Sequence, residues 1–106
     1  MSEQELTPTE NQGEKVSEWV NAPEDSHVAR FRLIDRSGSE FGASSEIWVT
    51  FKSSIKNHKA PASYRYTFAT HDEARSVWAA LKGSAHPGEV VHSELILPRV
   101  PYQRVS

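Results

Sequence analysis

This sequence of 106 residues contains no cysteine. Disulfide frameworks, thiolate chemistry and zinc sites built on cysteine are therefore excluded. No stretch approaches the roughly 18 uninterrupted apolar residues of a membrane helix. The N-terminal residues have neither the basic start nor the apolar run of a secretory signal. We therefore expect a cytoplasmic protein that does not act at a membrane.

Motifs of catalysis and cofactor binding are also scarce. Gly38 and Gly42 lie in a Ser-rich stretch with no Lys-Ser or Lys-Thr pair after them, which argues against a phosphate-binding loop. The five histidines form no HExxH pair, so a metal site would require the fold to bring distant histidines together. The candidate for such convergence is the set His71, His86 and His92. We predict a non-enzymatic protein with no catalytic residue, no cofactor and no metal.

The net charge of −2 hides two regions of opposite sign. Residues 1–25 contain seven acids and one base, for a net charge of −6, whereas residues 26–106 contain seven acids and eleven bases, for +4. The first region is rich in Glu, Gln, Thr, Ser and Pro, and has too few apolar residues to offset the entropy of ordering. We predict that residues 1–25 are an acidic, largely disordered arm and that residues 26–106 form one small α+β domain.

One part of the arm has an apolar pattern. Val16, Trp19 and Val20 fall at i, i+3 and i+4, which predicts about one helical turn docked on the domain and ended by Pro23. The alternative is a flexible tail that contains a tryptophan.

Three segments of the domain alternate between apolar and polar residues, as half-buried strands do. They are residues 27–35, 46–52 and 63–68, and β-branched and aromatic residues dominate them. The first segment has Ala29, Phe31 and Leu33 on its inward face. Consecutive strands with short links predict an antiparallel meander with one face exposed to water. Residues 95–97, in a tail broken by two prolines, form either a fourth strand at the sheet edge or an extended segment that covers the end of the helix.

A well-marked helix follows the third strand. Thr70 and Glu73 form a T-x-x-E capping box, in which each side chain satisfies a backbone amide at the start of the helix. An apolar stripe at helical spacing would lie on the sheet, and its members are Ala74, Val77, Trp78 and Leu81. The predicted fold class is α+β, with an antiparallel three- or four-stranded sheet, one amphipathic helix packed on one face, and a disordered N-terminal arm.

The order of these segments resembles that of a known family. Three motifs and a closing tyrosine occur in the family's order, and they are Val49–Lys52, Tyr64–Tyr66, Ala74–Gly83 with Ser84, and Tyr102. On these motifs residues 26–105 resemble the KTSC domain, a small module at the C-terminus of some lysyl-tRNA synthetases and free-standing in bacteria and phages. The resemblance implies a small α+β fold, no catalytic constellation, and work near nucleic acid or in a phage, where the location would be the host cytoplasm.

Basic and aromatic residues occupy the outward positions of the strands and the loop beside them. The candidate partner-binding residues are Arg30, Arg32, Trp48, Lys52, Lys56, Lys59 and Arg65. Such a face suits a protein-interaction module, in which Trp and Arg anchor a partner, and this is the function we predict. The alternatives are an RNA- or DNA-binding domain, a structural subunit of an assembly such as a virion, or an ordinary solvated sheet face. The acidic arm is a candidate to fold back on this face and screen it.

Overall fold

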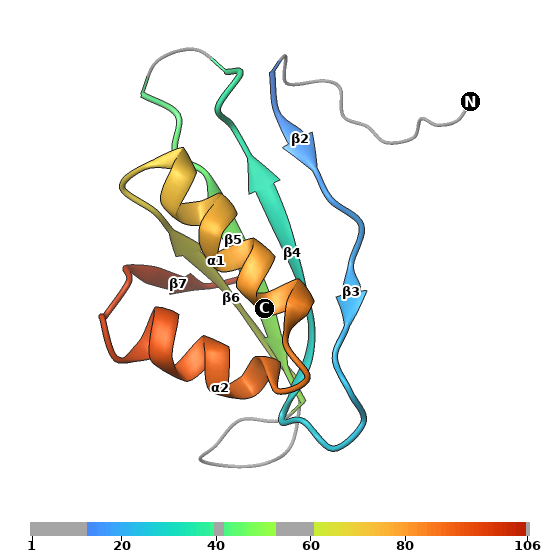
Figure 1. Ribbon diagram of the computed structural model, residues 1–106. Coiled ribbons are helices and arrows are strands. Elements are labelled where there is room, and N and C mark those ends of the chain that lie inside the picture. The colour runs from blue at the N-terminus through green and yellow to red at the C-terminus, as the bar shows by residue number, and fades with distance from the viewer. Residues whose placement is uncertain (1–12, 40–41, 53–60, 106) are drawn as a thin grey trace, which may run out of the picture.

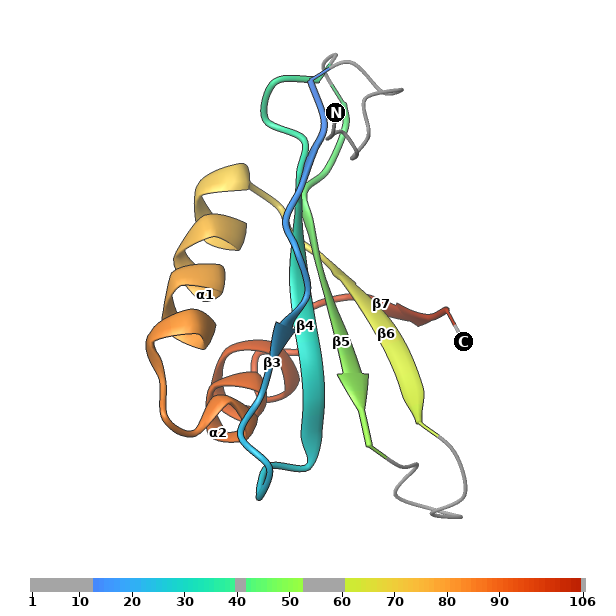
Figure 2. The same ribbon diagram turned by 90° about the vertical axis from the view of Figure 1, so that its right-hand side faces the viewer.

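The computed structural model describes residues 13–39, 42–52 and 61–105 (Figure 1). Within these residues the chain forms an antiparallel sheet with its helices packed on one side, as Figure 2 shows. The predicted α+β class is confirmed. The sheet has six strands rather than three or four, because short strands are added at both of its edges.

The three predicted strands form the centre of the sheet. They are β4 (Val28–Asp35), β5 (Glu46–Phe51) and β6 (Ala62–Thr67), and each pairs antiparallel with the next. The strand order is β2-β4-β5-β6-β7, and β3 also pairs with β4. The predicted meander is therefore confirmed.

The predicted helical turn at residues 16–20 is wrong. The segment instead forms β2 (Lys15–Val16) and β3 (Val20–Asn21), both antiparallel to β4. Ser17 joins the two, since its N–H donates to the Leu33 carbonyl and its Oγ accepts from the Leu33 N–H, both at 2.9 Å. β2 and β3 together have only four residues, too few to show the two-residue period of a strand. The spacing of Val16 and Val20 therefore matched that of a helix.

The tail also differs from its prediction. Residues 95–97 do not form a strand, because the chain runs from α2 (Pro87–Val91) into a π-helical turn, η1 (His92–Ile96). Val91 and Leu95, four residues apart, both have no exposed surface, which explains why this apolar run coils onto the sheet. The additional strand on this side is β7 (Tyr102–Arg104), which pairs with β6.

Helix α1 (His71–Gly83) follows its prediction closely. The Glu73 N–H donates to the Thr70 side-chain oxygen at 3.1 Å, as an N-cap requires. The whole predicted stripe is buried, namely Ala74, Val77, Trp78 and Leu81. The axis of α1 runs roughly along the strands, and α2 lies on the same side of the sheet (Figures 1 and 2).

The core lies between these helices and the inward side of the sheet. Phe31, Ile47 and Val49 are almost completely buried there, and the ring centres of Phe31 and Trp78 lie 5.7 Å apart in an edge-to-face arrangement. The prediction for Ala29 is wrong. A bulge between Val28 and Arg30 shifts the register, and Val28 is the fully buried residue while Ala29 is only half-buried.

No helix in the described ranges is long and apolar enough to cross a bilayer.

Candidate binding face of the sheet

The side of the sheet opposite α1 and α2 carries no helix within the described residues (Figure 2). We call it the helix-free face. Its central row crosses four strands, because Arg32 pairs with Trp48, Trp48 with Arg65, and Arg65 with Gln103. These residues share one side because alternate residues of paired strands point the same way.

A second row runs beside the first. Arg30 on β4 pairs with Thr50 on β5, which pairs with Ser63 on β6. The hydroxyls of Thr50 and Ser63 lie 2.9 Å apart and form a hydrogen bond. The helix-free face thus combines arginine, tryptophan and small hydroxyl side chains.

Trp19, which lies between β2 and β3, completes this face at its edge. The guanidinium carbon of Arg30 lies 4.1 Å from the centre of the indole, and that of Arg32 lies 4.5 Å from it. Both distances are well within the range of cation–π contacts. The described part of the acidic segment therefore covers these arginines with an aromatic ring, not with a carboxylate.

Glu46 is a carboxylate on this face, and it is 8% exposed. It accepts the indole N–H of Trp48 at 3.0 Å. It also lies 3.2 Å from a terminal nitrogen of Arg36 and 3.8 Å from Nε of Arg65. The Arg65 guanidinium donates to the side-chain oxygen of Gln103 as well. This network holds Trp48 and Arg65 in fixed orientations.

Arg30 and Arg32 are placed differently. Within the described residues neither guanidinium forms an ion pair or a hydrogen bond, and Nε of Arg32 is buried without a partner. Burial lowers the pKa of Arg32, and the neighbouring Arg30 lowers it further. Two positive charges thus lie side by side, and no carboxylate of the described residues forms an ion pair with either of them.

Four of the seven predicted residues lie together on the face, namely Arg30, Arg32, Trp48 and Arg65. Lys52 follows the end of β5, where its ammonium donates to the backbone carbonyl of Glu24. Lys56 and Lys59 lie outside the described residues. Sequence reasoning did not assign Trp19 and Gln103 to this face.

A serine–histidine contact lies at the junction of β5 and α1. Ser45 Oγ lies 2.7 Å from His71 Nδ1 and accepts from the Arg36 N–H at 2.9 Å. Ser45 Oγ and His71 Nδ1 share a hydrogen bond, and the tautomer of the imidazole decides which of the two donates. Ser45 is only 1% exposed. The pair therefore fastens the strand to the helix and does not present a nucleophile to substrate.

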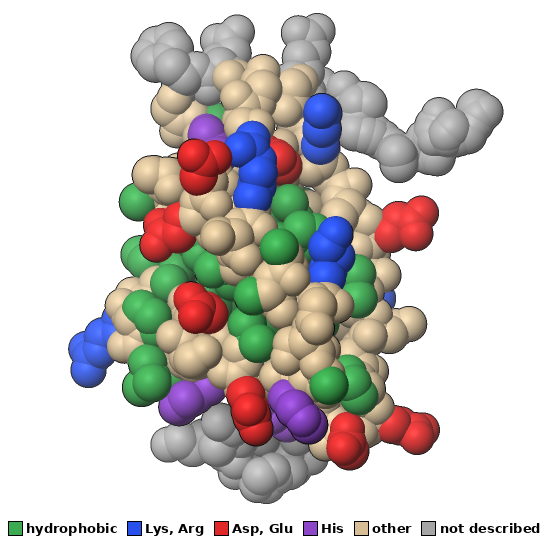
Figure 3. Space-filling model, viewed as in Figure 1, with side chains coloured by type: hydrophobic (Ala, Val, Ile, Leu, Met, Phe, Trp, Pro, Cys, Tyr) green, Lys and Arg blue, Asp and Glu red, His purple; other side chains and the backbone are tan. Residues whose placement is uncertain are grey.

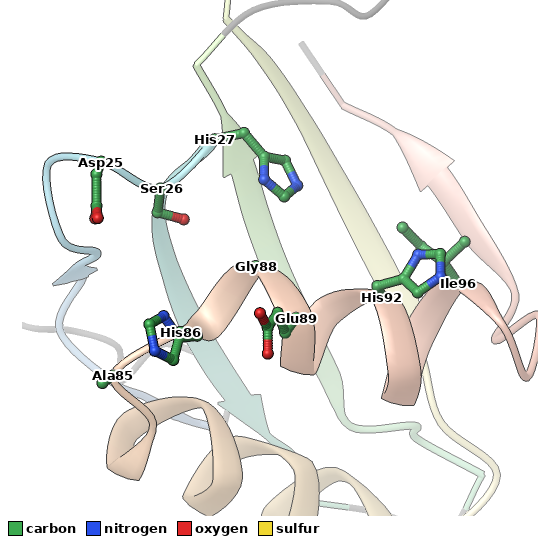
Figure 4. A pocket seen from close by; sticks show the side chains of 9 residues that line it. All are labelled: Asp25, Ser26, His27, Ala85, His86, Gly88, Glu89, His92 and Ile96. Carbon is green, nitrogen blue, oxygen red and sulfur yellow. The ribbon is translucent and has the colours of Figure 1, made fainter.

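The other described histidines line a cavity of about 380 Å³ at the end of the molecule where α2 begins. Figure 4 shows His27, His86 and His92 spread around this cavity with Glu89, and Figure 3 shows histidines gathered at this end of the helix side. His71 does not line this cavity, so the candidate set of His71, His86 and His92 is not brought together. No group of three His, Cys, Asp or Glu among the described residues can hold a metal ion.

Comparisons with protein-family models, with curated proteins and with solved structures found no match to this chain. The KTSC resemblance therefore stays a prediction.

Proposed function

We propose that this chain is a non-enzymatic protein-interaction module that binds a partner protein through the helix-free face of its sheet. The observation that supports this most is the central row, in which Trp48 lies between Arg32 and Arg65 on adjacent strands. The KTSC resemblance, with its free-standing bacterial and phage members, is compatible with such an accessory role.

The residue types of the row are those that dominate binding energy at protein interfaces. Tryptophan and arginine are enriched among interface residues whose truncation costs about 2 kcal/mol or more. Trp48 is half-buried, and its indole N–H is already satisfied by Glu46. Its position is thereby fixed before binding, which lowers the entropy lost when a partner docks.

Charge favours a protein partner over a nucleic acid. Glu46 lies within the face, and the acidic segment that contains Glu14 and Glu18 runs along its edge. The whole chain has a net charge of −2. A long polyanion gains affinity by neutralising many phosphates, and these carboxylates oppose that. A protein contact needs only a local match of charge.

The test is a comparative affinity capture with the tagged full-length chain. Wild type, Trp48→Ala and the control Lys82→Ala are incubated with the lysate of the cell that makes the protein. Lys82 is an exposed residue of α1, outside the helix-free face. We expect at least one protein that wild type and Lys82→Ala capture at least about tenfold better than Trp48→Ala, because losing an interface anchor costs about 2 kcal/mol or more.

Equal capture of every protein by Trp48→Ala and wild type would overturn the proposal. The alternatives have their own measurements. Salt-sensitive binding of single-stranded RNA or DNA that is lost in Arg65→Ala would favour a nucleic-acid-binding domain instead. A discrete homo-oligomer in light scattering, with no captured partner, would favour a structural subunit.

A further inference from the structure

Three arginines form ion pairs among the described residues, and Arg30 and Arg32 are not among them. A guanidinium nitrogen of Arg36 lies 2.9 Å from a carboxylate oxygen of Glu14. The corresponding distances are 3.8 Å for Arg65 and Glu46 and 3.2 Å for Arg75 and Asp35. For the guanidiniums of Arg30 and Arg32, the interaction that the structure defines is stacking on the indole of Trp19. They are two residues apart on β4 and point to the same side of the sheet.

The indole orients both guanidiniums and leaves donors available. A guanidinium that stacks on an aromatic ring uses its face for the contact, and its N–H groups lie around the edge. Those N–H groups match the two oxygens of a carboxylate or of a phosphate. Nε of Arg32 is buried and unpaired, so this donor has lost its hydration without gaining a partner in the fold.

We propose that Arg30, Arg32 and Trp19 form a binding site for an oxyanion, either a carboxylate or a phosphate group, carried by a side chain of the partner protein. The inference rests on the proposed function and names the chemistry that the partner presents. An oxyanion there neutralises two adjacent like charges and accepts hydrogen bonds from the terminal N–H groups of the two guanidiniums, which are not buried. The lowered pKa of Arg32, which follows from burial and then from Arg30, agrees with a site that lacks its counter-charge.

Trp19 makes this site depend on the acidic N-terminal segment. Residues on both sides of Trp19 pair with β4, through β2 and β3, which holds the indole over the arginines. Removing the indole would let two long side chains separate into solvent and lose their common orientation. Trp19 is therefore a positioning residue of the site.

The first experiment is an NMR titration of the full-length protein with sodium acetate, sodium phosphate or sodium chloride at matched ionic strength. The probes are the Nε–H resonance of Arg32 and the indole N–H resonances of Trp19 and Trp78. Trp78 is buried between α1 and the sheet and serves as the internal control. We expect saturable shifts at Arg32 and Trp19 with acetate, phosphate or both, at concentrations on the order of millimolar, and no such shifts with chloride.

The relative response to acetate and phosphate separates an acidic side chain from a phosphorylated one. In Arg30→Gln/Arg32→Gln the saturable shift at Trp19 should disappear, and Lys82→Gln should keep it. Arg30 is exposed, so Arg30→Gln alone is the fallback if the double variant does not fold, with an expected loss of affinity of roughly tenfold. Identical responses to all three salts, or a double variant that responds like wild type, would overturn the inference.

The capture experiment distinguishes a failure of this inference from a failure of the proposed function. If Arg30→Gln/Arg32→Gln captures the partner as wild type does while Trp48→Ala loses it, the oxyanion site is wrong and the interaction face stands. If Trp48→Ala captures every protein normally, the proposed function is wrong whatever the titration shows. Loss of capture in both variants, together with the salt-specific titration, supports both.

Discussion

The two faces of the sheet are built from neighbouring residues of the same strands, but they are stabilised by different interactions. Phe31 on β4 is 1% exposed and packs against α1, whereas the next residue, Arg32, points to the helix-free face and rests on Trp19. Tyr66 and Arg65 on β6 show the same contrast. One face is held by apolar burial, and the other by charge, stacking and hydrogen bonds.

This difference separates stability from recognition. Burial of apolar surface is the main favourable term in folding, so the inward face should carry most of the free energy of unfolding. Exposed charge and stacking contacts contribute little to that free energy. Substitutions on the helix-free face should therefore change binding far more than folding.

The largest expected effect comes from Phe31→Ala. Removing a fully buried ring leaves a cavity and should lower the free energy of unfolding by about 3–5 kcal/mol. Urea unfolding followed by circular dichroism measures it. The matched control is the adjacent Arg32→Ala, for which we expect a loss below about 1 kcal/mol. Similar losses for both variants would contradict the division between the faces.

The next effect appears only at alkaline pH. Burial, with Tyr102 and Tyr64 nearby, raises the pKa of Tyr66 to about 12 from its usual 10.0. Because the unfolded chain releases this proton first, the stabilisation is complete below about pH 10 and should be lost as pH rises toward 12. Urea unfolding at pH 9 to 11.5 should show a steeper decline for wild type than for Tyr66→Phe. Tyr102→Phe, at a residue that is 63% exposed, removes one of the neighbours that raise this pKa and should give a decline between those of wild type and Tyr66→Phe.

A smaller effect should follow from Thr70→Ala. The side-chain oxygen of Thr70 accepts the Glu73 N–H at the start of α1, and its loss should cost about 1 kcal/mol. The melting temperature of Thr70→Ala should fall, and Thr70→Ser should restore most of it. If Thr70→Ser is as unstable as Thr70→Ala, the hydroxyl is not the cause.

The smallest effect on folding is expected for Trp48→Ala, the variant expected to impair binding most. The side chain is half-buried and has no helix over it, so the loss in free energy of unfolding should be about 1 kcal/mol or less. Chemical denaturation measures this beside the capture experiment. A loss as large as that of Phe31→Ala would place Trp48 in the core and remove the distinction between the faces.

Sequence alone predicted the long periodic elements well. Eight-residue β4 and six-residue β5 and β6 show several cycles of alternation, and α1 has both a cap and a stripe. The sequence did not predict the short elements. β2 and β3 have two residues each and β7 has three, fewer than the alternation needs to become visible.

For the helix-free face, sequence predicted which side chains point outward but not what they touch. Alternation placed Arg30, Arg32, Trp48 and Arg65 on one side. The position of Trp19 depends on the pairing of a distant segment with β4, which no local pattern encodes. The two-residue separation of Glu46 and Trp48 on one strand was visible, but the hydrogen bond between them depends on side-chain orientation.

The pairing of residues 13–25 with β4 has a consequence for how copies of this chain meet. An unpaired strand edge is a template for another chain's backbone, and long apolar edges lead to aggregation. The edge of eight-residue β4 is covered by β2, Ser17 and β3, whereas the opposite edge of the sheet is a three-residue strand that follows Pro101. A shortened chain that begins at residue 26, where the composition changes, would therefore leave the edge of β4 unpaired. Because β4 is the longest strand, this shortened chain should self-associate. The acidic segment therefore covers the edge of β4 that another chain could otherwise pair with.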